Sequence, residues 1–303
     1  MAYPSGRHGA AESRPKSIVF CNLCGLGVAY PVPGMEEIED LYASGTYWEN
    51  RPVERLTRRK FPVPYAMAEA RWKLLEPFLR TEEGPLAILD VGAGHGFMGM
   101  VAVRSQAVSL GKYTAVEKDC SLMESLKLTW NEASPGISLQ IAANLDEVEG
   151  FFRCAVLSHI LEHVIDPKGL MLQVMRKLEP GGIVFIDVPN QDHLFKYDVF
   201  PHFLFFNANS LKLLLEMCGL RTGFVDTFGK GMDRSPLNYR NTSLLRTTAL
   251  RFITAAGTVL PTNVMPAFFN RYFGMEEINS RGTWIRALAF ARSSSRNGEA
   301  NRP

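Results

Sequence analysis

The sequence lacks the features that would place it in a membrane or secreted class. Its longest apolar stretch, residues 247–261, is interrupted by Arg251 and ends in proline, so it is too short and too polar to span a bilayer. The first 17 residues are polar and include Pro4 and Pro15, which is unlike the hydrophobic region of a secretory signal. We therefore expect a cytoplasmic protein without a membrane span.

Cysteine and net charge are also low. The five cysteines are an odd number and are unevenly spaced, which argues against a disulfide framework and favours a reducing compartment. The net charge of +2 gives no reason to expect nucleic acid as a partner. Hydrophobic residues make up 46% of the 303 residues and charged residues 21%, which is ordinary for a globular protein.

One short cysteine motif stands near the N-terminus. Cys21-x-x-Cys24-Gly25 is typical of one half of a zinc ribbon, in which two thiolates on a tight turn share a tetrahedral metal. The second half is missing, because the other three cysteines are scattered singles. We therefore favour a degenerate knuckle and predict no metal, with Cys21 and Cys24 as the weaker alternative. Residues 1–63 are expected to hold a disordered tail over 1–17, this knuckle and an arm rich in proline and aromatic residues.

A glycine-rich stretch dominates the rest of the chain. The apolar run 86–89 leads to Asp90 and then to Gly92, Gly94 and Gly96. This pattern predicts a buried parallel strand that turns sharply into a helix. Glycines let a ligand approach the backbone, and the free N–H groups of the helix point at the turn. The stretch therefore predicts a seat for a nucleotide-like ligand.

Two ligands fit these glycines. Gly94-x-Gly96-x-x-Gly99 satisfies the dinucleotide fingerprint. In that register, however, Asp90 stands where a dinucleotide site needs an apolar residue, whereas a carboxylate there suits a ligand with an ammonium group. Glu117, at the end of the next apolar run, suits ribose hydroxyls in either case. An ammonium-bearing nucleoside indicates S-adenosylmethionine.

Strands and helices alternate along the chain, which predicts an α/β protein with an open parallel sheet. One strand is expected to end at the glycine stretch. Six further strands are expected over 113–116, 138–141, 154–157, 183–188, 220–228 and 283–291. Helices are expected over 35–42, 64–80, 97–106, 121–130, 167–178, 210–218 and 243–260. Gly181 and Gly182 are expected to stop the fifth of these helices, and Ser210 to cap the sixth.

Four segments together resemble the class I S-adenosylmethionine-dependent methyltransferases. Residues 88–96 (Ile-Leu-Asp-Val-Gly-Ala-Gly-His-Gly) resemble their first motif, and Glu117 matches their ribose-binding acid. Residues 157–167 resemble their strand-four motif, and residues 178–190 their strand-five turn and strand end. The N-terminal knuckle and arm resemble a subset of this superfamily that acts on small molecules.

The resemblance implies a Rossmann-like, seven-stranded and mostly parallel sheet with helices on both faces and an antiparallel last strand. The methyltransferase domain would then span residues 64–292, with a helical insertion over 229–281 and a disordered tail over 293–303. It also implies S-adenosyl-L-methionine as cofactor, held by residues that match the family's positions: Asp90, Gly92, Ala93, Gly94, Gly96, Glu117, Asn144, Leu145 and Ser158. Asn144 stands where the family has an acid at the adenine, so Asp146 is the alternative there.

For catalysis we single out His159, Glu162, His163 and His202. Methyl transfer to a hydroxyl needs a base, and the histidine pKa lies near working pH. His159 is expected nearest the strand end, and His202 is an equal candidate on the same rim; Glu162 and His163 alternatively brace the loop. The ubiquinone-biosynthesis O-methyltransferases bind a divalent metal through a similar Glu-x-x-Glu-His sequence, which leaves a metal at His159, Glu162 and His163 open.

These observations predict O-methylation of a small-molecule acceptor with a histidine base. The alternatives are an NAD-binding oxidoreductase and a methyltransferase-like binding protein without activity. A homodimer is left open.

Overall fold

The structure is a computed structural model that describes residues 1–4, 15–34, 36–38, 52–80, 84–134, 136–236 and 259–292, together with residues 238, 248, 252, 253, 255 and 257. Most of the helix predicted over 243–260 and the tail 293–303 lie outside the described residues. Of the helix predicted over 35–42, residues 36–38 are described, and they are helical.

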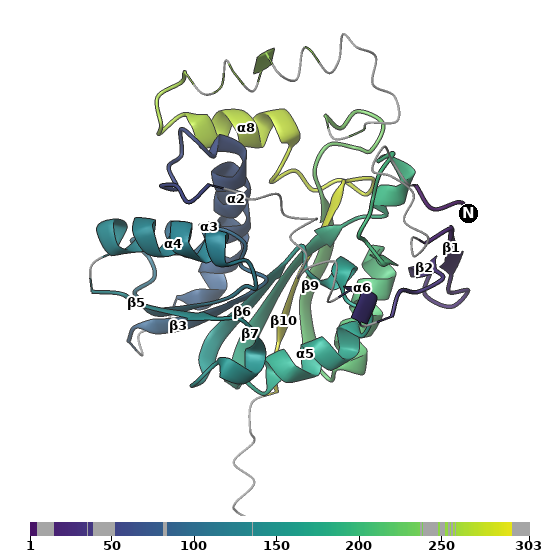
Figure 1. Ribbon diagram of the computed structural model, residues 1–303, viewed down its shortest axis with the longest axis horizontal. Coiled ribbons are helices and arrows are strands. Elements are labelled where there is room, and N and C mark those ends of the chain that lie inside the picture. Colours follow the sequence, from purple (N-terminus) through teal and green to yellow (C-terminus); the bar gives the residue numbers. More distant parts are fainter. Residues whose placement is uncertain are drawn as a thin grey trace, which may run out of the picture.

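A seven-stranded sheet forms the centre of the molecule (Figure 1). Its strands are β3 (Leu86–Val91), β4 (Leu110–Val116), β5 (Ser138–Ala142), β6 (Phe152–Ser158), β7 (Leu178–Pro189), β9 (Arg221–Phe228) and β10 (Trp284–Phe290). Their order across the sheet is β5-β4-β3-β6-β7-β10-β9. The pairs from β5 to β7 are parallel, while β10 runs antiparallel to both neighbours. The predicted sheet and its antiparallel last strand are confirmed.

Helices cover both faces of this sheet (Figure 1). One face carries α2 (Pro62–Leu79), α3 (Phe97–Ala102) and α4 (Cys120–Ala133), and the other carries α5 (Pro167–Met175) and α6 (Ala208–Met217). The strands supply both cores by alternation, since Ile88 faces the first set of helices and Leu89 the second. Burial of β3 on both faces explains why its sequence is a continuous apolar run.

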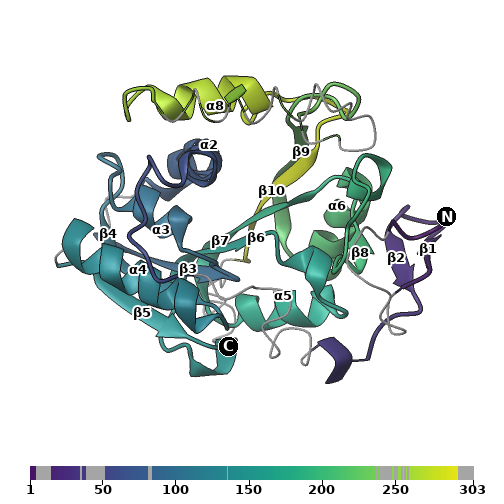
Figure 2. The ribbon, with the colours of Figure 1, turned by 45° about the horizontal axis from the view of Figure 1, so that its top comes forward.

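A second, three-stranded sheet lies beside α6 and was not predicted (Figure 2). It pairs β1 (Ser17–Phe20), β2 (Gly27–Tyr30) and β8 (Leu204–Phe205). The start of the chain joins it: the terminal amine of Met1 donates to the Ile18 carbonyl, and Tyr3 is buried. The expectation of disorder is therefore wrong for residues 1–4 and 15–17. Residues 5–14 lie outside the described part of the chain.

Helix α8 (Met265–Phe273), within the predicted insertion, packs across α2 (Figures 1 and 2). Phe269 and Phe273 meet Ala66 and Ala70, whose small side chains let the two helices approach closely. Helix α8 thus supports the outer side of α2.

Two predicted boundaries are wrong for local reasons. Asn207, not Ser210, caps α6: its side chain accepts from the Ser210 N–H while the Ser210 hydroxyl accepts from the Asn207 N–H. Gly181 and Gly182 do not form a turn ahead of the strand, because β7 already begins at Leu178 and its pairing with β6 is irregular there. Helix α5 accordingly ends at Met175.

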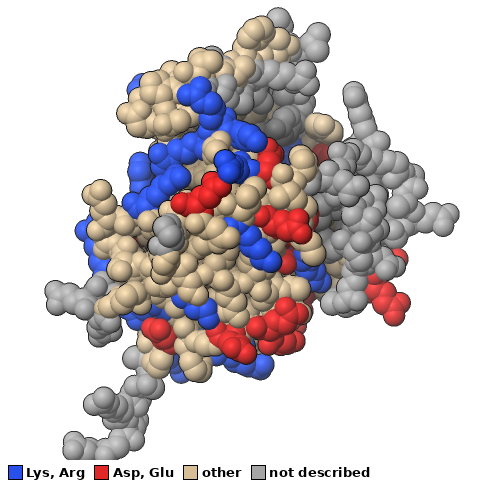
Figure 3. Space-filling view, turned by 60° about the vertical axis from the view of Figure 1, so that its left-hand side comes forward, with Lys and Arg blue, Asp and Glu red and all other residues tan. Residues whose placement is uncertain are grey.

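Acidic and basic side chains are interspersed on the face shown in Figure 3. Basic residues near the start of α2 pair with acids: Arg55 with Glu132, and Lys60 with Glu54. Such exposed pairs contribute little to stability, about 0–1 kcal/mol each. This surface is therefore electrically mixed.

Gly99 in α3 should not tolerate a side chain. A Cβ added there would lie 2.6 Å from the Tyr113 ring. In an ordinary helix Gly→Ala raises the free energy of unfolding by up to ~1 kcal/mol. A decrease at this position would therefore report the clash with the Tyr113 ring. We expect Gly99→Ala to lower the free energy of unfolding by about 1–3 kcal/mol, measured by urea denaturation. An unchanged or higher value would contradict the close packing of Tyr113 on α3.

Candidate active site

A cavity of about 1,060 Å³ opens where β3, β4 and β6 end. A crevice forms at the carboxyl ends of two adjacent parallel strands when the connections that follow them run in opposite directions. Most residues predicted to bind the cofactor line it: Asp90, Gly92, Ala93, Gly94, Glu117, Asn144, Leu145 and Ser158. Gly96 does not line the cavity; it caps α3 in the left-handed conformation.

The glycine loop leaves its backbone open to a ligand. Gly94 has a φ of +56°, and a Cβ there would meet nothing within 4 Å. Its N–H donates to Glu117 Oε2 at 2.9 Å, which ties the loop to the end of β4. The open space beside Gly94 is what the close approach of a cofactor requires.

Asp90 is buried at the end of β3, where the Tyr113 hydroxyl donates to its Oδ2 atom. Burial raises the pKa of this carboxyl to about 7, although the Tyr113 hydrogen bond and the charge of Arg71 oppose the rise. The carboxyl therefore changes charge near neutral pH. It is 2% exposed, and it lines the cavity.

Residues 143–145, which follow β5, and Ser158, which ends β6, also line the cavity. The Asn144 side chain accepts from the N–H groups of Asp146 and Glu147, so it caps the short helix η1 (Leu145–Glu147). Asp146, the alternative to Asn144, does not line this cavity. Among the described residues, the buried Ser158 hydroxyl has no hydrogen-bond partner.

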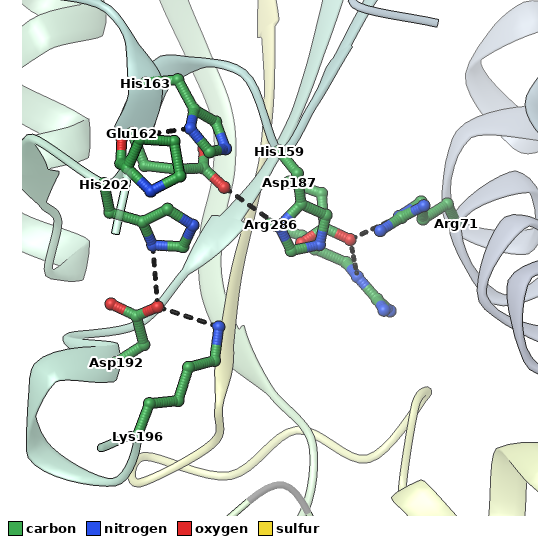
Figure 4. A network of polar contacts seen from close by, with 10 residues as sticks. Arg71, His159, Glu162, His163, Asp187, Asp192, Lys196, His202 and Arg286 are labelled. Atoms are coloured by element: carbon green, nitrogen blue, oxygen red, sulfur yellow. Dashed lines mark hydrogen bonds and ion pairs between the residues drawn. The ribbon is translucent and has the colours of Figure 1, made fainter. Parts of the chain in front are cut away.

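His159 and Glu162 form a pair at the cavity wall. His159 lines the cavity, and its Nδ1 lies 3.1 Å from Oε1 of Glu162, which is 1% exposed (Figure 4). Burial alone would raise the pKa of Glu162, but the His159 hydrogen bond and the nearby histidines lower it overall. An ionised Glu162 accepts a hydrogen bond from the Nδ1–H group of His159, and this tautomer leaves Nε2 as the hydrogen-bond acceptor. His159 also has a φ of +55°, the kind of strained backbone that clusters at functional sites.

His163 and His202 lie behind this pair. Nδ1 of His163 is 3.3 Å from the Pro201 carbonyl, and Nδ1 of His202 is 2.8 Å from Asp192 Oδ2 (Figure 4). His163 lines the cavity, but burial and the charge of His202 lower its pKa to about 4, which makes it a weak base. His202 does not line the cavity, so its predicted equal rank with His159 is not supported.

One group among the described residues could hold a metal ion. Donor atoms of Glu162, His163 and His202 lie within 4.8 Å of one another. This set differs from the one left open by the sequence, because His202 takes the place of His159. Two imidazoles and a carboxylate are ligands that suit divalent transition metals.

Cys21 and Cys24 lie apart from this cavity, on the turn between β1 and β2. Cys21 is exposed, and hydrogen bonds from the backbone N–H groups of Cys24 and Leu23 lower its pKa. Among the described residues, no third histidine, cysteine or acid joins them in a group suited to a metal.

Sequence reasoning missed Arg71. It extends from α2, is 8% exposed and lines the cavity beside Asp90. It belongs to no motif, and its position follows only from the packing of α2 against β7. The one signal in the sequence was an arginine at helical spacing from the apolar residues Met67, Leu74 and Leu75.

Comparison with known proteins agrees with this geometry. A family profile described as "Methyltransferase domain" matches residues 58–222, more than half of the chain. The chain belongs to this methyltransferase family.

More specific relatives are distant. The mitochondrial ubiquinone biosynthesis O-methyltransferase of Candida albicans is 27% identical over 36% of this chain and 34% of its own length. The corresponding enzyme of Xanthomonas oryzae pv. oryzae is 29% identical over 34% and 43%, respectively. The chain thus spans less than half the length of these relatives. A structure of coclaurine N-methyltransferase bound to N-methylheliamine and SAH is 13% identical, covers 86% of this chain and 88% of its own, and has a TM-score of 0.49.

The same findings bear on one alternative. The classic dinucleotide-binding sheet has six strands in the order 3-2-1-4-5-6, whereas here a seventh, antiparallel strand, β10, stands between β7 and β9. Together with the family match, this removes the NAD-binding oxidoreductase.

Within the described residues, no helix combines the length and apolar character that a membrane crossing requires.

Asp90 should make cofactor-product binding depend on pH. S-Adenosylhomocysteine carries an ammonium group that favours ionised Asp90, so below the pKa of about 7 a proton must first be removed. We expect affinity to rise from about pH 6 to pH 8 and then level off, with at most roughly tenfold per pH unit on the rising limb. Calorimetry at several pH values measures this dependence.

Asp90→Asn should remove the pH dependence, while Asp146→Asn, outside the cavity, should retain it. A wild-type affinity that stays constant from pH 6 to pH 8 would show that Asp90 does not meet the ammonium group.

Proposed function

We propose that this enzyme methylates a hydroxyl group of a small-molecule acceptor, with His159 as the general base. The observation that carries the proposal is the pair of His159 and Glu162 at the cavity wall, 3.1 Å apart. This pair acts as an oriented imidazole. The buried carboxylate accepts a hydrogen bond from one ring N–H group, and the other ring nitrogen is left to take a proton from the hydroxyl of the methyl acceptor. The similarity to O-methyltransferases of ubiquinone biosynthesis supports oxygen as the atom methylated.

The cofactor-binding roles are proposed from the cavity lining. Glu117 would hold the ribose hydroxyls, Asp90 would face the ammonium group, and residues 144–145 would border the adenine. The open side of Gly94 admits the ligand close to the backbone. The cofactor supplies an electrophilic methyl group, and the residues at the end of β6 aim the acceptor at it.

His159 is preferred over the other two histidines on geometry and charge. His163 faces the cavity but has a pKa lowered to about 4, so it binds a proton poorly at neutral pH. Nδ1 of His202 lies 2.8 Å from Oδ2 of Asp192, and His202 does not line the cavity. The backbone N–H of His159 donates to the Asp187 carbonyl, which fixes the residue relative to β7.

We expect His159→Ala to lower kcat by on the order of 100-fold or more, with S-adenosylhomocysteine binding within twofold of wild type. Glu162→Gln should lower kcat by about tenfold, since it still accepts a hydrogen bond but no longer stabilises the imidazolium. The assay follows radiolabelled methyl transfer to a mixture of phenols and hydroxy acids. His202→Ala should retain activity if His159 is the base, because His202 does not line the cavity, and should lose it if a metal held by Glu162, His163 and His202 ionises the acceptor. If His159→Ala keeps more than a tenth of kcat, the base is another group.

The candidate metal ligands Glu162, His163 and His202 offer a second mechanism for ionising the acceptor. In it, a bound divalent ion lowers the pKa of the acceptor hydroxyl. A chelator separates the two routes. A histidine base predicts that kcat is unchanged after dialysis against EDTA, and metal-assisted ionisation predicts that activity is lost and returns with added divalent ion. Loss and recovery would overturn the metal-free base mechanism.

A further inference from the structure

Two of the five cysteines stand close together, outside the cavity. Cys21 follows β1 directly, and Cys24 comes three residues later on the turn that leads to β2, at the edge of the molecule (Figure 2). Cys21 is exposed and Cys24 is partly buried. Of the other three, Cys154 and Cys218 are buried, and Cys120 is exposed at the start of α4. The chain thus offers one pair of neighbouring thiols, and one of them meets solvent.

The backbone of the turn holds this pair in place. The Gly25 N–H donates to the Cys21 carbonyl at 2.8 Å, which closes one helical turn over residues 22–24. On its other side, the Cys24 carbonyl accepts from the Asn207 side chain at 3.1 Å. In a helical turn, residues three apart have their Cβ atoms about 5–6 Å apart, and a disulfide needs a separation of about 4 Å. A small local movement therefore brings the two sulfur atoms to bonding distance.

The two thiols are suited to different steps of thiol–disulfide exchange. Hydrogen bonds from the backbone N–H groups of Cys24 and Leu23, and one to the Cys24 side chain, lower the pKa of Cys21. The attacking species in such an exchange is the thiolate, so Cys21 is the better nucleophile. Burial has the opposite effect on Cys154 and Cys218, since it raises the pKa of both thiols.

A metal would compete for the same two sulfur atoms. A structural zinc ion takes four ligands, and this turn supplies two. Within the part of the chain that the structure describes, no further histidine, cysteine or acid joins Cys21 and Cys24 in a group suited to a metal. Both thiols are therefore available for covalent chemistry.

We propose that Cys21 and Cys24 form a redox-active dithiol that is oxidised by low-molecular-weight disulfides such as glutathione disulfide. The Cys21 thiolate attacks one sulfur of glutathione disulfide, which forms a mixed disulfide and releases one glutathione. Cys24 then loses its proton and attacks Sγ of Cys21, which closes the Cys21–Cys24 disulfide and releases the second glutathione. Two electrons pass from the protein to glutathione disulfide, and the two thiol protons end on the two glutathione molecules. The reaction is independent of methyl transfer, because neither cysteine lines the cavity.

The test treats the reduced full-length protein with glutathione disulfide at pH 7. Every sample carries Cys120→Ser, which removes the other exposed thiol. Glutathione release and the mass of the chain are followed together. We expect two glutathione molecules released per chain and a loss of two hydrogens, with peptide mapping placing the disulfide between Cys21 and Cys24.

Two single variants separate the steps. Cys24→Ser should release one glutathione and keep the other as an adduct on Cys21, because the second thiol is missing. Cys21→Ser should react at least roughly tenfold more slowly than Cys24→Ser, since the remaining thiol lacks the hydrogen bonds that stabilise the thiolate.

Three results would overturn the proposal. In the first, the parent protein stops at a mixed disulfide. In the second, the adduct of Cys24→Ser lies on Cys154 or Cys218, so that Cys21 is not the reactive thiol. In the third, the isolated protein holds zinc at the turn and reacts only after treatment with a chelator, which would make the pair a metal site.

Discussion

The carboxylate of Asp187 is the interaction on which the walls of the site depend. It stands near the end of β7, opposite Arg286 in the register with β10, and its Oδ2 also receives Arg71 from α2. Burial alone would raise the pKa of Asp187, but the two arginines lower it to about 2, so the carboxylate is ionised under all ordinary conditions. Its backbone carbonyl accepts from His159. One residue thus positions both the basic wall and the histidine wall of the cavity.

The site divides into two parts with different construction. The part near the glycine loop is built by strand ends and short turns, so its residues are close in sequence as well as in space. The opposite part is built by α2, by the arm residue Ile38 and by the loop that carries His159 and His163. Helix α8 packs on the outer side of α2 and supports this wall without touching the glycine loop.

The main sheet could be predicted because its signals are local. Apolar runs that end in Asp90 or Glu117 and are followed by helical periodicity mark parallel strands within a few residues. The small sheet of β1, β2 and β8 could not be predicted, because β8 has two residues and pairs with a strand more than 170 positions earlier. The cap of α6 was missed because Asn207 and Ser210 both favour helix starts, and only the backbone geometry distinguishes the cap residue from the third helical residue.

The sequence by itself determined which strand ends and turns line the cavity near the glycine loop. Asp90, the glycines and Glu117 lie on two consecutive βα units, and the right-handed crossover leaves their carboxyl ends side by side. Only the tertiary structure decided that Arg71 and His159 line the cavity and that His202 does not. Whether a side chain reaches a cavity depends on the packing of helices and loops from distant parts of the chain. Arg71 is 116 residues from Asp187, and no local pattern encodes that contact.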